Sequence, residues 1–149
     1  MEPAEVETGG VRIEVENVGG IERTAIALDP GVTVLTGRNA TNRTSLLRAL
    51  MAAVGSDDAT LKGDATAGSV TLRLDGETYT REFERENESV TTSGDPYLAD
   101  STVADTFAFL LGSNAARRAV REGRDLRPLV MDPVDTAAIT AEIERLEAE

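Results

Sequence analysis

The sequence predicts an α/β fold in which a mixed sheet surrounds one helix and further helices follow. Three observations carry this prediction. Apolar and polar residues alternate over residues 11–16 and again over 70–74, as in strands with one buried face. A β-branched run, a polar turn and a stretch of helix formers follow one another over residues 31–54. From Asp100 onward the apolar residues recur at helical spacing.

The N-terminal elements are a tail, a hairpin and a buried strand. Residues 1–10 are acidic and end in two glycines, which predicts a loose tail. The alternating strand at 11–18 and a second strand at 21–28 are joined by Gly19-Gly20, a signal for a tight hairpin turn. Residues 31–36 are apolar and β-branched, so we expect them to form a buried strand.

A second hairpin is predicted in the middle of the chain. Residues 55–68 are rich in Gly, Asp, Ala and Thr, which predicts a surface loop. The strand at 70–74 is followed by Asp75-Gly76, a hairpin turn signal, and by a returning strand at 79–85. The chain then turns into a short third strand that runs through Val90.

The last third of the chain predicts helices. The first is capped near Ser101 and has an apolar face made of Val103, Phe107, Leu110 and Leu111. The second, at 115–122, carries the basic cluster Arg117, Arg118 and Arg121. This cluster is either a solvated helix face that balances nearby carboxylates or a contact for DNA or phosphate. Residues 129–132 are apolar before a Pro turn, and we expect them to pack in the core.

At the C-terminal end, Ile139, Ile143 and Leu146 recur at spacings of four and three after a good N-cap at Asp135. Two heptads are fewer than a coiled coil needs. The pattern therefore leaves two alternatives, the start of a coiled-coil arm or a helix that folds back onto the sheet.

Length and composition predict one cytoplasmic domain. At 149 residues the chain is most simply one lobe, residues 11–132, between the tail at 1–10 and the helix at 133–149. No run of residues is long and apolar enough to span a bilayer, so we expect no membrane partner. The chain contains neither Cys nor His, which excludes disulfides, thiolate chemistry and the usual general base.

The excess of acidic over basic residues indicates a protein that works in concentrated salt. The formal net charge is −12, and Lys62 is the only lysine among the basic residues. A lysine-poor, carboxylate-rich surface is typical of proteins that work in concentrated salt, where the Debye length falls to about 3 Å. The acidity therefore neither excludes DNA as a partner nor supports it.

Residues 37–45 read Gly-Arg-Asn-Ala-Thr-Asn-Arg-Thr-Ser and match a phosphate-binding loop with two signature positions altered. The usual pattern is Gly, four residues, Gly, Lys, then Ser or Thr. Gly37 and Thr44 fit this pattern, whereas Asn42 replaces the second glycine and Arg43 replaces the lysine. The strand before and the helix after the loop let its amides and the helix N-terminus converge on phosphates. The alternative is a solvated polar turn that happens to contain these residues.

The two altered positions differ in their consequences. Asn tolerates a left-handed backbone better than most residues, so Asn42 can hold a turn built for Gly. Arg43 keeps the positive charge but is planar and bulkier than lysine. Thr44 supplies the hydroxyl for a nucleotide-bound magnesium ion. The loop therefore predicts nucleotide binding more strongly than fast hydrolysis.

Residues 37–47 resemble the Walker A segment of the SMC-like ATPases, which act in chromosome maintenance and recombination repair. In that group an Asn also sits two residues after the first Gly, here Asn39. Residues 11–18 look like the first strand of those heads, which ends in an Asn and a hydrophobic residue. The loop resembles in particular the archaea-specific SMC-related proteins of halophilic archaea. The resemblance covers about residues 11–54.

The resemblance implies that this chain is the N-terminal lobe of an ABC-type ATPase head that binds ATP and Mg2+. The residues implied at the nucleotide are Gly37, Arg38, Asn39, Ala40, Thr41, Asn42, Arg43, Thr44 and Ser45. Thr44 would meet magnesium through the nucleotide, and Ser45 would lie on the α-phosphate side. No catalytic residue is assigned, because the Asp-Glu pair and the Ser-Gly-Gly signature of this group belong to a C-terminal lobe.

Two features depart from the group's pattern. Val18-Gly19-Gly20 stands where an aromatic residue and an Arg or Lys usually contact the nucleotide. The chain also contains no Gln, although these heads use a Gln loop to sense magnesium and water. Asn114 falls at the corresponding place and could contact magnesium in its stead. An ordinary turn between helices, capped by Asn114, explains the residue equally well.

The implied partners are a C-terminal ATPase lobe of the same or another chain and a second head in a head-to-head homodimer. The resemblance also allows DNA as a partner and a location at the nucleoid. ATP hydrolysis is not expected from this chain alone. One alternative function is a catalytically degenerate P-loop-fold module for structure or interaction, in which Arg43 packs without nucleotide. An unrelated acidic α+β domain is a second alternative.

Overall fold

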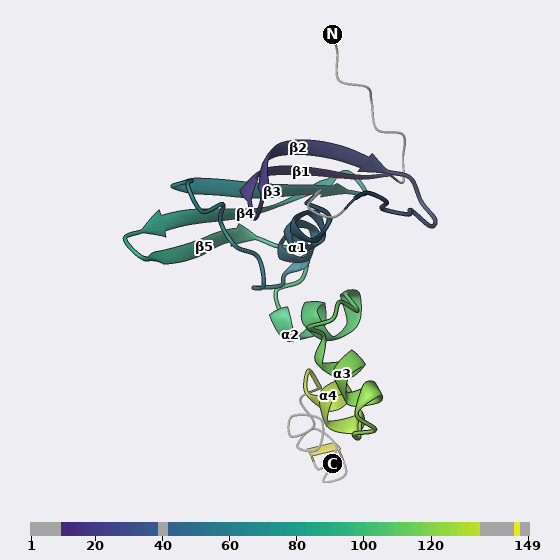
Figure 1. Cartoon of the computed structure of the whole chain (residues 1–149). Helices are drawn as coiled ribbons and strands as arrows, with labels where there is room; N and C mark the ends of the chain where they lie inside the picture. The colour runs from purple at the N-terminus through teal and green to yellow at the C-terminus, as the bar shows by residue number, and fades with distance from the viewer. Residues whose placement is uncertain (1–9, 39–41, 135–144, 147–149) are drawn as a thin grey trace.

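The computed structural model describes residues 10–38, 42–134 and 145–146, and Figure 1 shows their arrangement. In chain order the elements are β1 (Val11–Val18), β2 (Ile21–Leu28), α1 (Arg43–Val54), β3 (Ala67–Leu74), β4 (Glu77–Glu86), β5 (Ser89–Asp95), α2 (Ser101–Val103), the π-helical η1 (Ala104–Ala108), α3 (Ala115–Arg121) and α4 (Arg127–Met131). Among the described residues, no helix is long and apolar enough to cross a membrane.

The strands form one sheet in the order β2-β1-β3-β4-β5, and every neighbouring pair is antiparallel. The predicted mixed sheet is therefore wrong for the described residues, while the predicted α/β class is confirmed at the coarse level. The hairpin turns at Gly19-Gly20 and Asp75-Gly76 are confirmed, since each joins paired strands through two residues. The last strand, β5, is longer than predicted and ends at Asp95.

The core lies between one face of the sheet and α1, which crosses that face below the strands (Figure 1). Alternate residues of β1, β3 and β4 point into it, as the period of two predicted. The sheet contributes Ile13, Val15, Val70, Leu72 and Phe83, and the helix contributes Ala49, Ala52 and Ala53. Small alanine side chains allow the helix to lie close to the sheet. The first turn of α1 is thereby fixed relative to the tip of the β1–β2 hairpin.

The segment before the loop is not the buried strand that the sequence predicts. Residues 32–38 belong to no helix or strand, and Val32 is 96% exposed and Val34 75%. A strand that is apolar on both faces needs neighbouring strands beside it and cover on each side. Among the described residues no strand pairs with this segment, so its apolar side chains stay in solvent.

The helical part departs from the prediction as well. After α2 the chain forms the π-helical η1 and leaves it in an extended conformation at Phe109. Phe107 is 52% exposed and Leu110 66%, so the predicted apolar face is not buried. Where the helix ends, the Asn114 side chain donates hydrogen bonds to the carbonyl oxygens of Asp105 and Thr106 in η1 and of Phe109 just beyond it, as described below.

The expected core packing of residues 129–132 is also wrong. These residues lie mainly in the short helix α4, where Val130 is 44% exposed and Met131 41%. The helix lies beyond α3, away from the sheet (Figure 1), so it has no large apolar surface to cover. The predicted tail at 1–10 and the predicted arm at 133–149 fall almost entirely outside the described residues.

Candidate phosphate-binding site

The centre of the candidate site is the start of α1. Asn42 precedes the helix with φ 57° and ψ 19°, the left-handed conformation that the sequence predicts for an Asn in place of the loop glycine. The N–H of Leu46 donates to the Asn42 carbonyl oxygen at 2.9 Å, which is the first helical hydrogen bond. The Asn42 side chain does not cap the helix.

This helix end suits an anion. The first N–H groups of a helix have no intrahelical acceptor, and the helix dipole gives that end a partial positive charge. The first turn of α1 contains no acidic residue, and Arg43 adds a full positive charge to it. A cation in the first turn is unfavourable unless an anion compensates it. The arrangement therefore matches the site that phosphate groups use at helix N-termini.

The tip of the β1–β2 hairpin is bonded to the same helix turn. The Gly20 N–H donates to Ser45 Oγ at 3.1 Å, and Asn42 Nδ2 donates to the Gly20 carbonyl oxygen at 2.9 Å. A Cβ on Gly20 would lie 2.2 Å from Asn42 Oδ1, and one on Gly19 would lie 2.6 Å from Ser45 Oγ. Neither glycine position has room for a side chain.

A cavity of about 530 Å³ opens beside this helix turn. Its walls come from the start of β2, from the segment before the loop and from the start of α1: Gly20, Ile21, Glu22, Arg23, Thr24, Leu35, Thr36, Gly37, Asn42, Arg43 and Leu46. The volume lies in the range of small-molecule and cofactor sites. Arg43 is the side chain of the altered loop that brings positive charge to this cavity.

The structure gathers several of the predicted site residues here. Gly37, Asn42 and Arg43 line one cavity, and Thr44 and Ser45 follow on the first turn of α1. Arg38 is exposed next to Gly37. The predicted contacts of Asn39, Ala40 and Thr41 lie outside the described residues. The roles of all nine residues toward a nucleotide stay predictions.

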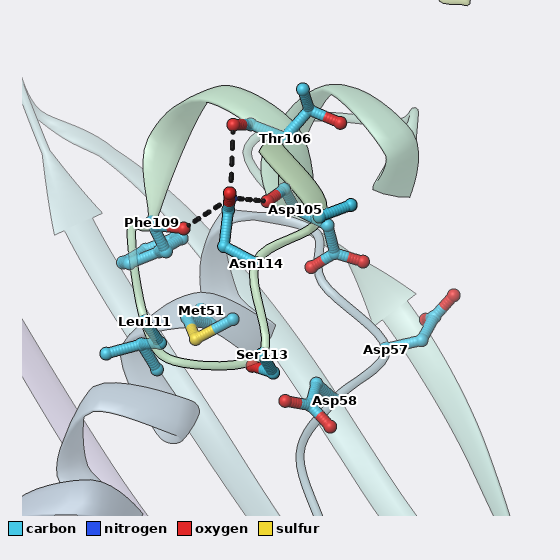
Figure 2. A pocket seen from close by; sticks show the side chains of 10 residues that line it. Met51, Asp57, Asp58, Asp105, Thr106, Phe109, Leu111, Ser113 and Asn114 are labelled. Atoms are coloured by element: carbon cyan, nitrogen blue, oxygen red, sulfur yellow. Dashed lines mark hydrogen bonds between the residues drawn. The ribbon is translucent and has the colours of Figure 1, made fainter. Parts of the chain in front are cut away.

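Asn114 lies elsewhere, in a second cavity of about 430 Å³ (Figure 2). This cavity is lined by Met51, from the C-terminal half of α1, and by Asp57 and Asp58 from the following loop. Asn114 is only 6% exposed, and its Oδ1 accepts a hydrogen bond from the Arg117 N–H at 2.8 Å, so it caps α3.

The side-chain amide of Asn114 is also engaged. Its Nδ2 donates to the carbonyl oxygens of Asp105, Thr106 and Phe109 at 2.7, 3.2 and 2.8 Å (Figure 2). The capped turn between helices, one of the two alternatives for this residue, is therefore what the structure shows. Its predicted contact with magnesium stays a prediction, and it does not share a cavity with Arg43.

Gly20 is the site residue that sequence reasoning missed. The Gly19-Gly20 pair is fully explained by a two-residue hairpin turn, in which Gly19 takes φ 57°. Gly20 does not have a positive φ, which leaves its lack of a side chain unexplained by the turn. The close approach of Asn42, 22 residues further along the chain, accounts for it.

Comparison with known proteins agrees with the resemblance of the loop. A family model described as "AAA domain" matches residues 12–127. Smc-like protein Sph3 of Haloferax volcanii is 64% identical over 136 residues, which cover 91% of this chain and 21% of that protein. Smc-like protein Sph2 of Halobacterium salinarum is 41% identical over 141 residues, which cover 95% of this chain and 21% of that protein. The similarity to SMC-like proteins of halophilic archaea is thus confirmed.

The matched region is small in relation to these relatives. Smc-like protein Sph1 of Halobacterium salinarum is 34% identical over 151 residues, which cover 92% of this chain but 24% of that protein. The chain therefore spans about a fifth to a quarter of the length of the relatives it matches.

Proposed function

This chain belongs to the AAA domain family, and from that premise we propose that it is the nucleotide-binding half of an SMC-like ATPase head. The observation that carries the proposal is the start of α1, where an uncapped helix end, a left-handed Asn42 and a cationic Arg43 meet beside a cavity. Loop amides and Arg43 hold the β-phosphate of ATP. Thr44 contacts the Mg2+ that the nucleotide carries.

A C-terminal ATPase lobe completes this site. The support comes from residues 31–36, which place Val32, Val34 and Leu35 in solvent next to the phosphate-binding loop. Exposed apolar side chains in a segment that pairs with no described strand support a surface that another part of the protein covers. The lobe supplies the carboxylates for hydrolysis, so the isolated chain binds ATP and does not turn it over.

The wider role follows from the same premise. Nucleotide binding drives two heads together, and the completed protein acts in chromosome maintenance or DNA repair, in the cytoplasm or at the nucleoid. The Smc-like relatives are the support for this role.

One observation favours the alternative, a structural module without nucleotide. The side chains of Asn42 and Ser45 already make hydrogen bonds within the chain, to Gly20. If these bonds replace the nucleotide, Arg43 serves packing or a partner protein instead.

Calorimetric titration with Mg2+-ATP in concentrated potassium chloride separates the two functions. We expect saturable binding that Arg43→Ala weakens at least about 10-fold, since a charge-assisted phosphate contact is lost. Thr44→Ala should weaken binding only in the presence of Mg2+ and have no effect once EDTA removes the ion.

The matched control is Arg48→Ala, which removes the same charge from the same helix. Arg48 lies 4.0 Å from Asp58 on the next loop and does not line the cavity, so its loss should leave ATP affinity unchanged. Absence of ATP binding even with the C-terminal lobe supplied would leave the structural module as the function.

A further inference from the structure

Asn42 does more than hold a left-handed turn, because its side chain connects two parts of the site. Asn42 directly precedes α1, and Ser45 lies three residues further along, in the first turn of the helix. Between them lies Gly20, whose carbonyl oxygen accepts from Asn42 Nδ2 and whose N–H donates to Ser45 Oγ. We call these three residues the clasp. A glycine at position 42, as in the usual loop, has no side chain with which to make the bond.

Three contacts hold the end of the β1–β2 hairpin in place beside the clasp. The Gly19 N–H donates to the Thr60 carbonyl oxygen at 2.8 Å, and Asn17 Nδ2 donates to the Ala67 carbonyl oxygen at 3.0 Å. Val18 bridges to Leu61, which is buried in the core. The tip is thus bonded to the segment before β3 and to the first residue of β3 on one side, and to the start of α1 on the other.

The backbone of residue 42 sets the direction of the amides that follow it. A site performs best when neighbouring residues lock its geometry before the ligand arrives. We infer that Asn42 is a positioning residue, which uses the clasp to hold the start of α1, with its first N–H groups, in the conformation that binds phosphate before nucleotide is present. This inference rests on the proposed function, because it assigns Asn42 a role in ATP binding.

The inference predicts that restoring the usual glycine weakens the site. Asn42→Gly permits the left-handed backbone but removes the bond to Gly20, so binding of the nucleotide must itself fix the backbone at position 42. We expect about a 10-fold rise in the Kd for Mg2+-ATP. Asn42→Asp, which keeps the shape but replaces the donor by an acceptor, should weaken binding at least as much.

A rescue experiment separates positioning from a merely structural role. Gly20→Ala adds a Cβ that would lie 2.2 Å from Asn42 Oδ1, so the substitution alone should weaken ATP binding by more than 10-fold. Asn42→Gly removes that atom. In the double variant Gly20→Ala/Asn42→Gly, the affinity should therefore recover to that of Asn42→Gly alone.

The test is calorimetric titration of the wild-type chain and the variants with Mg2+-ATP in concentrated potassium chloride, with the melting temperature of each. The inference predicts tighter binding by the double variant than by Gly20→Ala, with Asn42→Gly melting close to wild type. ATP affinity of Asn42→Gly equal to or above wild type would overturn the inference and leave the proposed function intact. Losses that simply add in the double variant would also overturn it. Absence of binding by the wild type, with the C-terminal lobe supplied, would overturn the proposed function and the inference together.

Discussion

The exposed segment at residues 32–38, before the proposed phosphate-binding loop, gives a direct test of the proposed assembly with a C-terminal lobe. Val32 and Val34 lie two residues apart in this segment, and their side chains are 96% and 75% exposed. We consider the double substitution Val32→Thr/Val34→Thr, which keeps the branched shape and the extended preference but replaces a methyl group by a hydroxyl in each residue.

The magnitude follows from the exposure of the two side chains. In the isolated chain both hydroxyls stay in water, so the free energy of unfolding should change by no more than about 0.5 kcal/mol. In the complex with the C-terminal lobe both would be buried. A buried hydroxyl without a partner costs about 1–3 kcal/mol, and two of them should weaken the complex by about 3 kcal/mol, a little over 100-fold in Kd.

Two measurements are needed. Denaturant unfolding gives the stability of the isolated chain, and calorimetric titration of the chain with the C-terminal lobe gives the Kd of the complex. Val70→Thr is the matched control, because Val70 is fully buried in β3 and the same chemical change should cost about 2 kcal/mol of stability there. If the double variant loses as much stability as this control, the segment is packed in the isolated chain. If lobe affinity is unchanged, the segment is not the interface.

Three further predictions concern the described fold. Phe83→Ala should cost about 3–5 kcal/mol in denaturant unfolding, since this ring is 2% exposed in the core; a cost below about 1 kcal/mol would contradict that packing. Asn114→Ala should expose the α3 amides to hydrogen exchange, because the cap and three carbonyl contacts are lost, whereas Asn114→Asp keeps the cap acceptor and should protect α3 better. The pKa of Glu14 is lowered, mainly by its hydrogen bond from Arg12 and also by the charge of Arg73, so ionised Glu14 stabilises the fold above its ordinary pKa of 4.5. This contribution is lost as pH falls through the lowered pKa. Glu14→Gln should therefore lower the free energy of unfolding by at most about 1 kcal/mol at pH 7 in low salt and leave it unchanged in strong acid. A loss of stability that does not depend on pH would contradict this role of Glu14.

Local signals predicted the two hairpins and the buried face of β1. The two-residue turns at Gly19-Gly20 and Asp75-Gly76 need only their own backbone freedom, and the structure gives Gly19, Asp75 and Gly76 positive φ values. The left-handed Asn42 was predictable for the same reason. The period of two along β1 identified Ile13 and Val15 as core residues.

Features that depend on distant neighbours were not predictable. Residues 31–36 have the composition of a buried strand, but whether such a strand is covered depends on parts that the described residues do not contain. The apolar residues after Asp100 suggested one helix face, yet η1 ends at Ala108, and Asn114 donates hydrogen bonds to the carbonyl oxygens of Asp105 and Thr106 near that end. The clasp joins Gly20 to Asn42 and Ser45, which follow it by 22 and 25 positions in the sequence, and no local pattern signals such a contact.

We propose that this chain is the phosphate-binding half of an ATPase and needs a second lobe for hydrolysis. The most direct measurement is ATP turnover in concentrated potassium chloride by the chain alone, by the C-terminal lobe alone and by their mixture. We predict turnover in the mixture alone, abolished by Thr44→Ala in this chain and retained by Arg48→Ala. Turnover by the isolated chain, or none in a mixture shown to form the complex, would contradict the account.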